Sequence, residues 1–258
     1  MSSNCTDATC DYNFYVVPMA NPDGYEYART TNASWVKNRQ KNNGSSCVGV
    51  NLNHNYPPDA EFATHGTDDP CSCDNRGVKP ESAKEVAALI EMKSCCAMES
   101  SYALSMTFLP CEKDRLLWPK ASTTVLIPEN ENYKNLARHF DDSGATELKP
   151  YSELKLASGT AMDFCYSADP RAYALTLMLK KSNVTTRALS ITGKIIGGIS
   201  NMVAVSGAEK ETQANCPLEP ASEDELINID PTDITPLNLD TLRSGDCPSY
   251  ASVSSEIK

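Results

Sequence analysis

Histidine is scarce in this chain, and long apolar runs are missing. Only three histidines occur among its 258 residues, and none begins a His-x-x-Glu or His-Glu-x-x-His metal motif. The sequence also lacks a Gly-x-Ser-x-Gly turn and a Walker loop, which argues against a serine hydrolase of that type and against a P-loop enzyme. Because no run of about 18 apolar residues occurs, the sequence predicts no membrane-spanning helix.

Basic residues are outnumbered as well. The chain has 23 Lys and Arg against 34 Asp and Glu, which gives a formal net charge of −11. An acidic surface repels the phosphates of nucleic acids and the headgroups of anionic lipids. Nucleic acid is therefore not an expected partner.

Cysteine, in contrast, is abundant. Eleven cysteines are scattered along the chain, and they lack the paired spacing of a structural zinc site. The odd number leaves at least one thiol free or paired with another chain. Four Asn-x-Ser/Thr sequons accompany them, at Asn4, Asn32, Asn43 and Asn183. Together these features predict a disulfide-bonded glycoprotein of the extracellular space or secretory lumen. The first ten residues contain no apolar signal segment, so we expect the natural N-terminus to be missing.

Apolar periodicity predicts strands that alternate with helices. Strands are expected at 14–17, 102–108, 116–118 and 172–181, and helices at 80–92, 130–140 and 186–205. Residues 21–79 are predicted to be a long irregular region that begins with a turn at 21–24. This alternation is typical of an α/β fold with a mixed sheet.

Several short motifs between residues 21 and 71 occur in a fixed order. They are Asn-Pro-Asp-Gly-Tyr at 21–25, Trp35, Cys-Val-Gly-Val at 47–50, Asn-x-Asn-x-Asn at 51–55 and Pro-Cys at 70–71. In order and spacing they resemble the zinc carboxypeptidases of the pancreatic carboxypeptidase A/B type, the M14 family. The resemblance implies a central mixed twisted sheet with helices on both faces, truncated at the N-terminal side. It also implies a disulfide between Cys47 and Cys71.

The resemblance divides the chain into three parts. Residues 1–10 are expected to be a polar tail, and residues 11–206 a carboxypeptidase-like domain. Residues 207–258 are acidic and aperiodic, which predicts a disordered tail.

The residues at the family's reactive positions differ from those the chemistry needs. Met106 stands at a zinc-ligand position, and the first two ligands would lie upstream of residue 1. The positions of the catalytic Glu, the oxyanion Arg and the mobile Tyr are occupied by Met178, Val36 and Lys155. A thioether is a poor ligand for zinc and accepts no proton, and valine carries no charge.

The family's substrate-binding positions are partly retained. Asn53 is kept, His54 replaces the Arg that binds the substrate carboxylate, and Met162 stands where side-chain preference is set. These three residues are the candidate substrate-binding residues, for an apolar C-terminal side chain. A simple packing role for Asn53 and Met162 is the explanation that we favour.

These substitutions favour a secreted, catalytically silent relative, for which we expect no cofactor and peptide or protein C-termini as partners. One alternative is an active metallocarboxypeptidase that lacks an N-terminal segment and uses zinc to remove C-terminal amino acids from peptides. A truncated or degraded gene product is a third reading, and a Cys/His dyad is a minor one. The His-x-x-Asp patterns at 65–68 and 139–142 are expected to be ordinary exposed residues rather than metal sites.

Overall fold

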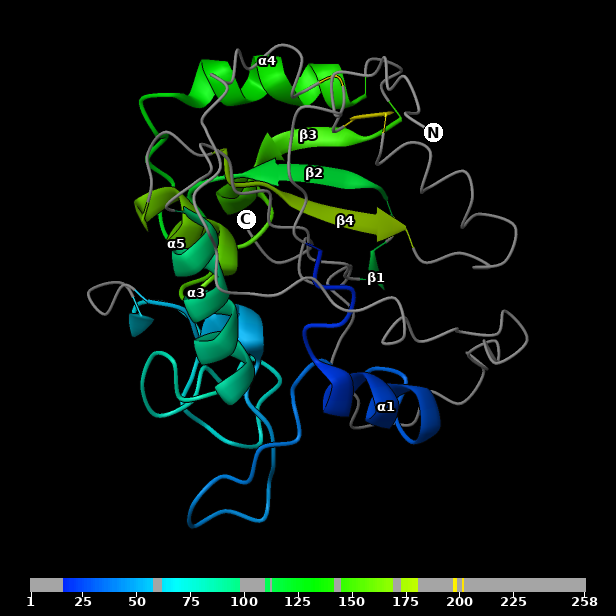
Figure 1. Cartoon of the computed structure of the whole chain (residues 1–258), viewed down its shortest axis with the longest axis vertical. Helices are drawn as coiled ribbons and strands as arrows, with labels where there is room; N and C mark the ends of the chain where they lie inside the picture. Colours follow the sequence, from blue (N-terminus) through cyan, green and yellow to red (C-terminus); the bar gives the residue numbers. More distant parts are fainter. Residues whose placement is uncertain are drawn as a thin grey trace, which may run out of the picture.

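The computed structural model describes residues 16–57, 62–97, 110–111, 113–141, 145–168, 173–180, 197–198 and 201 (Figure 1). The helices are α1 (Pro22–Thr30), α3 (Lys84–Ala97), α4 (Asn130–Phe140) and α5 (Ala161–Ala168). Two 3₁₀ turns, η2 (Leu52–His54) and η3 (Tyr151–Glu153), accompany them. The strands are β1 (Pro110–Cys111), β2 (Arg115–Trp118), β3 (Glu147–Pro150) and β4 (Thr176–Lys180).

The strands form one mixed sheet in the order β1-β4-β2-β3. β1 runs parallel to β4, and β2 runs parallel to β3, while β2 and β4 are antiparallel. In this register Leu116 lies opposite Leu177 on one side and Leu148 on the other. The mixed sheet agrees with the fold class expected from the sequence.

Helices cover both faces of the sheet, because successive side chains of a strand point to opposite faces. One buried cluster joins Leu116, Trp118 and Leu177 to the apolar side of α4. The other joins Leu117 and Met178 to residues of α5. Figure 1 shows α4 on one side of the sheet and α5 with α3 on the other. The predicted two-sided α/β arrangement is confirmed.

Helix α4 forms where the sequence predicts it, with the same bounds. Its buried residues Tyr133, Leu136, Ala137 and Phe140 recur at the three- and four-residue spacing of a helix face. Burying each of the large ones contributes about 1.5–3 kcal/mol. The expected helix at 186–205 is represented in the described residues by helical backbone at 197–198 and 201. A side chain at Gly198 would overlap the ring of Phe140, so Gly198 lies close against α4.

The turn expected at 21–24 is instead the start of α1. The side chain of Asn21 accepts a hydrogen bond from the N–H of Gly24 at 3.1 Å, and Pro22 opens the helix. An Asn N-cap followed by Pro starts a helix as readily as it makes a turn. Residues 21–79 are therefore not irregular throughout.

Other boundaries also differ from the prediction. Helix α3 begins at Lys84 rather than at residue 80, because Glu81 has a φ of 57° that a right-handed helix does not allow. Val16 and Val17 are not in a strand, and Val16 is 75% exposed. Strands β1 and β3 were not predicted. The expected strand at 102–108 and both expected tails lie outside the described residues.

Candidate functional site

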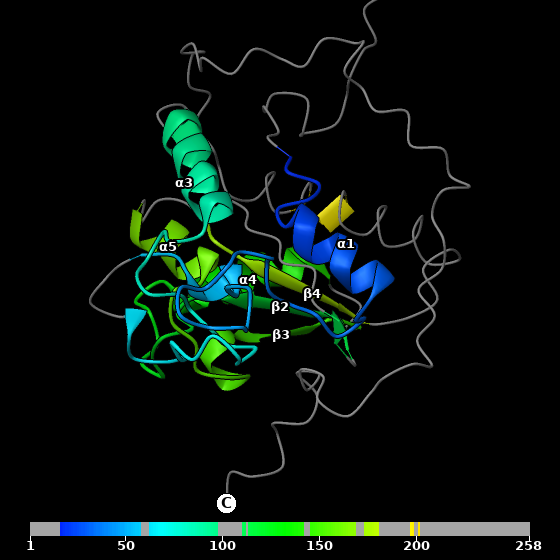
Figure 2. The same cartoon turned by 90° about the horizontal axis from the view of Figure 1, so that it is seen from below.

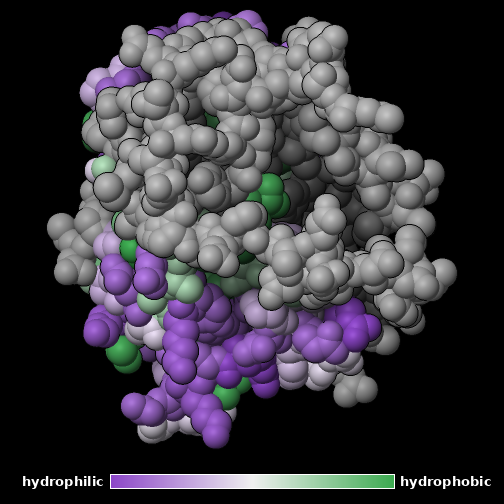
Figure 3. Space-filling view, in the orientation of Figure 1, coloured by the Kyte–Doolittle hydropathy of each residue, from purple (hydrophilic) through white to green (hydrophobic). Residues whose placement is uncertain are grey.

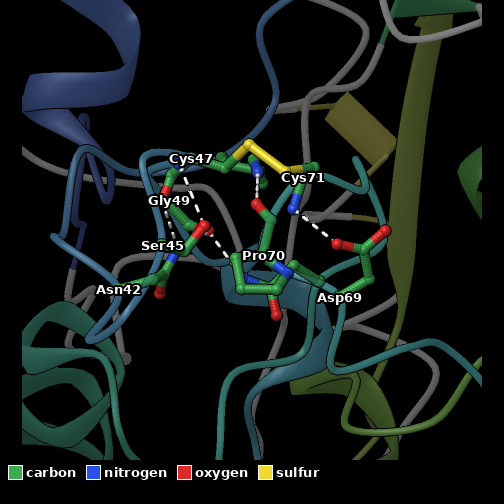
Figure 4. Close-up of a disulfide and its surroundings, with 9 residues drawn as sticks. Asn42, Ser45, Cys47, Gly49, Asp69, Pro70 and Cys71 are labelled. Carbon is green, nitrogen blue, oxygen red and sulfur yellow. Dashed lines mark hydrogen bonds between the residues drawn. A yellow bond between two sulfur atoms is a disulfide. The ribbon is translucent and has the colours of Figure 1, made fainter.

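A disulfide closes the irregular region at the position that the resemblance implies. Cys47 and Cys71 form a disulfide with 5.1 Å between their Cα atoms, across a sequence separation of 24 residues (Figure 4). The N–H of Cys71 donates to Asp69, and the side chain of Asn42 donates to the carbonyl oxygen of Cys47. A bridge of this span adds about 3 kcal/mol by restricting the unfolded chain. The predicted pairing is confirmed, and Cys73 is disulfide-bonded as well.

Buried asparagines hold the rest of this loop region. Irregular backbone leaves N–H and C=O groups without ladder partners, and these need other partners when they are buried. The Nδ2 atom of Asn55 donates to the carbonyl oxygens of Arg76 and Lys79 at 2.7 and 3.0 Å. Its Oδ1 atom accepts from the N–H of Ala83 just before α3. Oδ1 of Asn51 likewise accepts a hydrogen bond from the N–H of Asn53. The Asn-x-Asn-x-Asn motif therefore holds the backbone of the loop region through side-chain hydrogen bonds.

A carboxylate-centred cluster lies within this region. Asp74 receives a hydrogen bond from Nζ of Lys155 at 2.8 Å, and its other oxygen lies 3.4 Å from Nε2 of His54. The hydrogen bond with His54, then that from Lys155, hold the pKa of the Asp74 carboxyl well below its usual range, against the effect of partial burial. The structure thus joins His54 and Lys155, two of the positions singled out in the sequence, through one acid.

His54 is held at both ring nitrogens. Its side chain is only 3% exposed, and Nδ1 lies 3.0 Å from the carbonyl oxygen of Ser158. Because a carbonyl oxygen only accepts, Nδ1 carries the proton in that contact. Nε2 faces a carboxylate oxygen of Asp74 at 3.4 Å. The ring is therefore fixed in orientation between Ser158 and Asp74.

The remaining candidate substrate-binding residues differ in burial, because Asn53 is partly exposed and Met162 is buried. Oδ1 of Asn53 accepts from the N–H of Ala161 at 3.1 Å and so ties η2 to the start of α5, which Figure 2 shows beside it. Met162 follows in α5 and is completely buried. Both residues have packing partners, as the favoured interpretation of the sequence expects. Whether either contacts a ligand stays a prediction.

The position that the resemblance assigns to the catalytic acid lies in the core. Met178 of β4 is 0% exposed and belongs to the same apolar cluster as Met162, Leu117 and Cys165. Cys165 is a free, buried cysteine, and burial raises the pKa of its thiol. Such a thiol is protonated and inert at neutral pH. Cys165 therefore offers no reactive thiolate for the Cys/His dyad, the minor alternative drawn from the sequence.

The cations near Val36 make local contacts. Nζ of Lys37 donates to the carbonyl oxygen of Pro70 at 2.6 Å, and burial lowers the pKa of this ammonium. The guanidinium of Arg39 stacks 3.7 Å above the ring of Tyr27 and 4.7 Å above that of Trp35. Each cation is thus engaged within the loop region, whose surface is mostly hydrophilic on the face seen in Figure 3.

The described residues contain no group of three His, Cys, Asp or Glu side chains that is arranged to hold a metal ion. His65 lies 3.1 Å from the carbonyl oxygen of Ser122 through Nε2, and Asp68 pairs with Arg76 at 3.7 Å. The two side chains of the pattern at 65–68 thus contact different partners. Met106 lies outside the described residues. The described part of the chain therefore does not fit zinc by itself.

Asp74 was not singled out in the sequence. It lies 81 residues from Lys155 along the chain, and no short motif connects the two residues. The role of Asp163 was not predicted either: its carboxylate accepts from the N–H groups of Ala121 and Ser122 at 2.9–3.1 Å. Long-range pairs of this kind leave no local signal.

Comparison with known proteins bears on the cofactor. The profile of the family described as zinc carboxypeptidase matches residues 2–193. The expectation that no cofactor is involved is therefore wrong: zinc is the metal of the family to which these residues match. The expectation failed because it was drawn from single substituted positions rather than from the family as a whole.

Individual relatives agree with this match. The chain is 32% identical to human mast cell carboxypeptidase A over 161 residues, which cover 60% of this chain and 38% of that protein. It is 29% identical over 183 residues to the inactive metallocarboxypeptidase ecm14 of Schizosaccharomyces pombe, covering 66% of this chain and 36% of that one. The chain thus spans less than two-fifths of either relative.

Solved structures share the fold. Bovine thrombin-activatable fibrinolysis inhibitor, in complex with a tick carboxypeptidase inhibitor, superimposes with a TM-score of 0.67 at 21% identity. The likeness covers 75% of this chain and 69% of that one. Among the described helices, none is long and apolar enough to cross a membrane. With a family profile that matches well over half of its length, the chain belongs to the zinc carboxypeptidase family.

Proposed function

We propose that this chain is a secreted member of the zinc carboxypeptidase family that binds peptide or protein C-termini without hydrolysing them. The observation that carries the proposal is Met178. A general base must reach the proton that it abstracts and must have a lone pair of suitable basicity. Met178 has no such group, and its side chain is completely buried.

The oxyanion position supports the same conclusion. Val36 carries no charge, and the neighbouring Lys37 already donates to Pro70. Removing one preorganised oxyanion donor from an acyl-transfer enzyme costs about 3–4 kcal/mol of barrier. A chain without both base and cation would lose most of the rate enhancement.

The comparisons supply a precedent. One relative, from Schizosaccharomyces pombe, bears the name inactive metallocarboxypeptidase and matches 66% of this chain. Silent members therefore occur among the relatives of this chain, alongside proteins named as carboxypeptidases. The base and oxyanion positions are the reason that we group this chain with the silent ones.

Secretion is proposed from the disulfides and the sequons. The Cys47–Cys71 bridge is of the kind that persists in oxidising compartments. Asn43 lies in an exposed turn next to this bridge, where a glycan would meet no obstacle from Gly44, which has open space around it. Secretion into growth medium and a mass loss on treatment with an N-glycosidase would test this part.

The catalytic part is tested by hydrolysis with zinc supplied. The substrate is an N-terminally blocked dipeptide with a free, apolar C-terminal residue, and human mast cell carboxypeptidase A serves as the positive control. We expect no C-terminal amino acid to be released above background. Release that a chelator abolishes would overturn the proposal and favour the active metallocarboxypeptidase.

A further inference from the structure

The sequence contains a single Asn-Gly pair, at Asn43 and Gly44. The N–H of Ser45 donates to the carbonyl oxygen of Asn42 at 3.2 Å and closes a turn around this pair. Gly44 has a φ of 76°, the positive value that a glycine at the third position of such a turn supplies. Both residues of the pair are exposed. The pair therefore occupies the two central positions of a turn that faces solvent.

The two asparagines of this turn are held very differently. Nδ2 of Asn42 donates to the carbonyl oxygens of Cys47 and Gly49 at 3.2 and 3.3 Å (Figure 4). Within the described part of the chain, the side chain of Asn43 has no hydrogen-bond partner, and neither has the N–H of Gly44. A Cβ added at Gly44 would meet nothing within 4 Å. The side-chain amide of Asn43 and the backbone nitrogen that follows it are thus free to move against each other.

These two groups support an intramolecular reaction that consumes only water. The backbone nitrogen of Gly44 attacks Cγ of Asn43, so that an N–Cγ bond forms while the Cγ–Nδ2 bond breaks. Nδ2 leaves as ammonia and takes the proton that the attacking nitrogen loses. Water then opens the resulting succinimide ring. Opening at Cγ leaves an aspartate, whereas opening at the main-chain carbonyl leaves an isoaspartate, whose backbone runs through the former side chain.

The Asp-Gly pair at residues 23–24 provides a protected comparison within the same chain. The same ring would form there with water as the leaving group. Gly24, however, is buried inside helix α1, and its N–H donates to Oδ1 of Asn21 at 3.1 Å. Attack by that nitrogen requires the start of the helix to open first, whereas attack at Asn43 breaks no hydrogen bond among the described residues.

We propose that the Asn43–Gly44 pair is a self-modifying site, at which the folded chain converts Asn43 into aspartate or isoaspartate through a succinimide. Each conversion adds a negative charge near the Cys47–Cys71 bridge, and isoaspartate also lengthens the backbone of the turn. Nδ2 of Asn43 is at the same time the acceptor atom of a glycosylation sequon. Glycosylation and succinimide formation therefore exclude each other, a consequence that rests on the proposed secretion.

The test compares the folded chain with the reduced, denatured chain at the same pH and temperature. The full chain is exported to the bacterial periplasm, where disulfides form, so that no eukaryotic N-glycan is added. Aspartate and isoaspartate are measured by peptide mapping with an isoaspartate-specific methyltransferase. We expect Asn43 to convert in the folded chain within about threefold of its denatured rate, and isomerisation of Asp23 to be slowed about tenfold or more by folding. Slowing at Asn43 as strong as at Asp23 would overturn the proposal.

The nucleophile is identified by variants and by the products. Gly44→Ala places a methyl group beside the attacking nitrogen and should slow conversion about tenfold or more. Asn43→Gln keeps the amide and covers the case in which Gly44→Ala does not fold: its longer side chain would form a larger ring, so it should stay unmodified. In the native chain the rate should rise with pH, because the attacking nitrogen has to lose its proton. Formation of aspartate without isoaspartate, or a Gly44→Ala chain that converts as fast as native, would contradict the mechanism.

The competition with a glycan is measured on chain secreted by eukaryotic cells. The glycan is trimmed with an endoglycosidase that leaves the first sugar in place, because an N-glycosidase itself turns the asparagine into aspartate. We expect Asn43 that carries this sugar to stay unconverted under the same conditions, and conversion at the unglycosylated rate would refute the competition. If Asn43 carries no sugar at all, the proposed glycosylation at this residue fails, while the periplasmic chain still decides whether Asn43 modifies itself.

Discussion

Placing an acid at residue 178, the position that the resemblance assigns to the catalytic Glu, gives the sharpest test of the proposed lack of activity. In Met178→Glu, a carboxyl group replaces a thioether that is 0% exposed. Its cluster neighbours Leu117, Met162 and Ala174 are all completely buried. The residue opposite it in β2, Arg115, already binds Glu147 at 2.7 Å. The new acid therefore enters apolar surroundings.

The size of the effect follows from the cost of burying a charge. A fully buried Glu has its pKa raised by about 3–5 units, and each unit corresponds to about 1.4 kcal/mol. At neutral pH the ionised form thus costs about 4–7 kcal/mol, comparable to the whole stability of a typical domain. Met178→Leu conserves volume and should cost less than about 1.5 kcal/mol.

The effect depends on pH in a defined direction. Because the folded-state pKa of the introduced carboxyl group lies above its unfolded value, the folded Met178→Glu chain binds more protons in the window between the two. Stability therefore falls as pH rises through that window, and the loss is small near about pH 5 and large near about pH 8. Met178→Gln has nearly the same shape without the charge, so it should show little of this dependence.

Denaturant unfolding of the three variants at both pH values measures these differences. Hydrolysis of the blocked dipeptide, with zinc supplied, is measured in parallel and should stay at background. Equal stability of the Met178→Glu and Met178→Gln variants at the higher pH would refute the burial argument. Chelator-sensitive hydrolysis by Met178→Glu would show that the position faces a working reaction centre.

Three further predictions concern the loop region. Asn55→Ala leaves the buried N–H of Ala83 and the part-buried carbonyl groups of Arg76 and Lys79 without their amide partner and should cost about 2–3 kcal/mol in denaturant unfolding, whereas the exposed Asn43→Ala should change stability by less than about 0.5 kcal/mol. Replacing Cys47 and Cys71 by serine should lower stability by about 3 kcal/mol, and non-reducing peptide mapping that paired Cys47 elsewhere would contradict the bridge. The lowered pKa of Asp74 means that its contribution is present above the ordinary carboxyl pKa and is lost as pH falls below it. Since Asp74 is 38% exposed, solvent screening limits that contribution to about 1 kcal/mol. Asp74→Asn should therefore be less stable than the native chain by about that amount above about pH 4, and the difference should shrink progressively as pH falls further.

Features that depend on neighbours in the sequence could be predicted from the sequence alone. The bounds of α4 follow from apolar residues at helical spacing, and β2 follows from a short apolar run that a proline ends. The Cys47–Cys71 bridge was expected because the resemblance to the zinc carboxypeptidases implies it. In each case the deciding information lies within about one element or one loop.

Features that depend on distant residues were decided by the tertiary structure. Whether Asn21 opens a turn or caps a helix depends on the contacts of the following residues, and the start of α3 depends on Asn55 and on the backbone of Glu81. Asp74 meets Lys155 across 81 residues, and Met178 meets Met162 only because β4 packs against α5. A sequence can name the residue at such a position, but only packing determines whether its side chain faces a ligand, a neighbouring charge or the core.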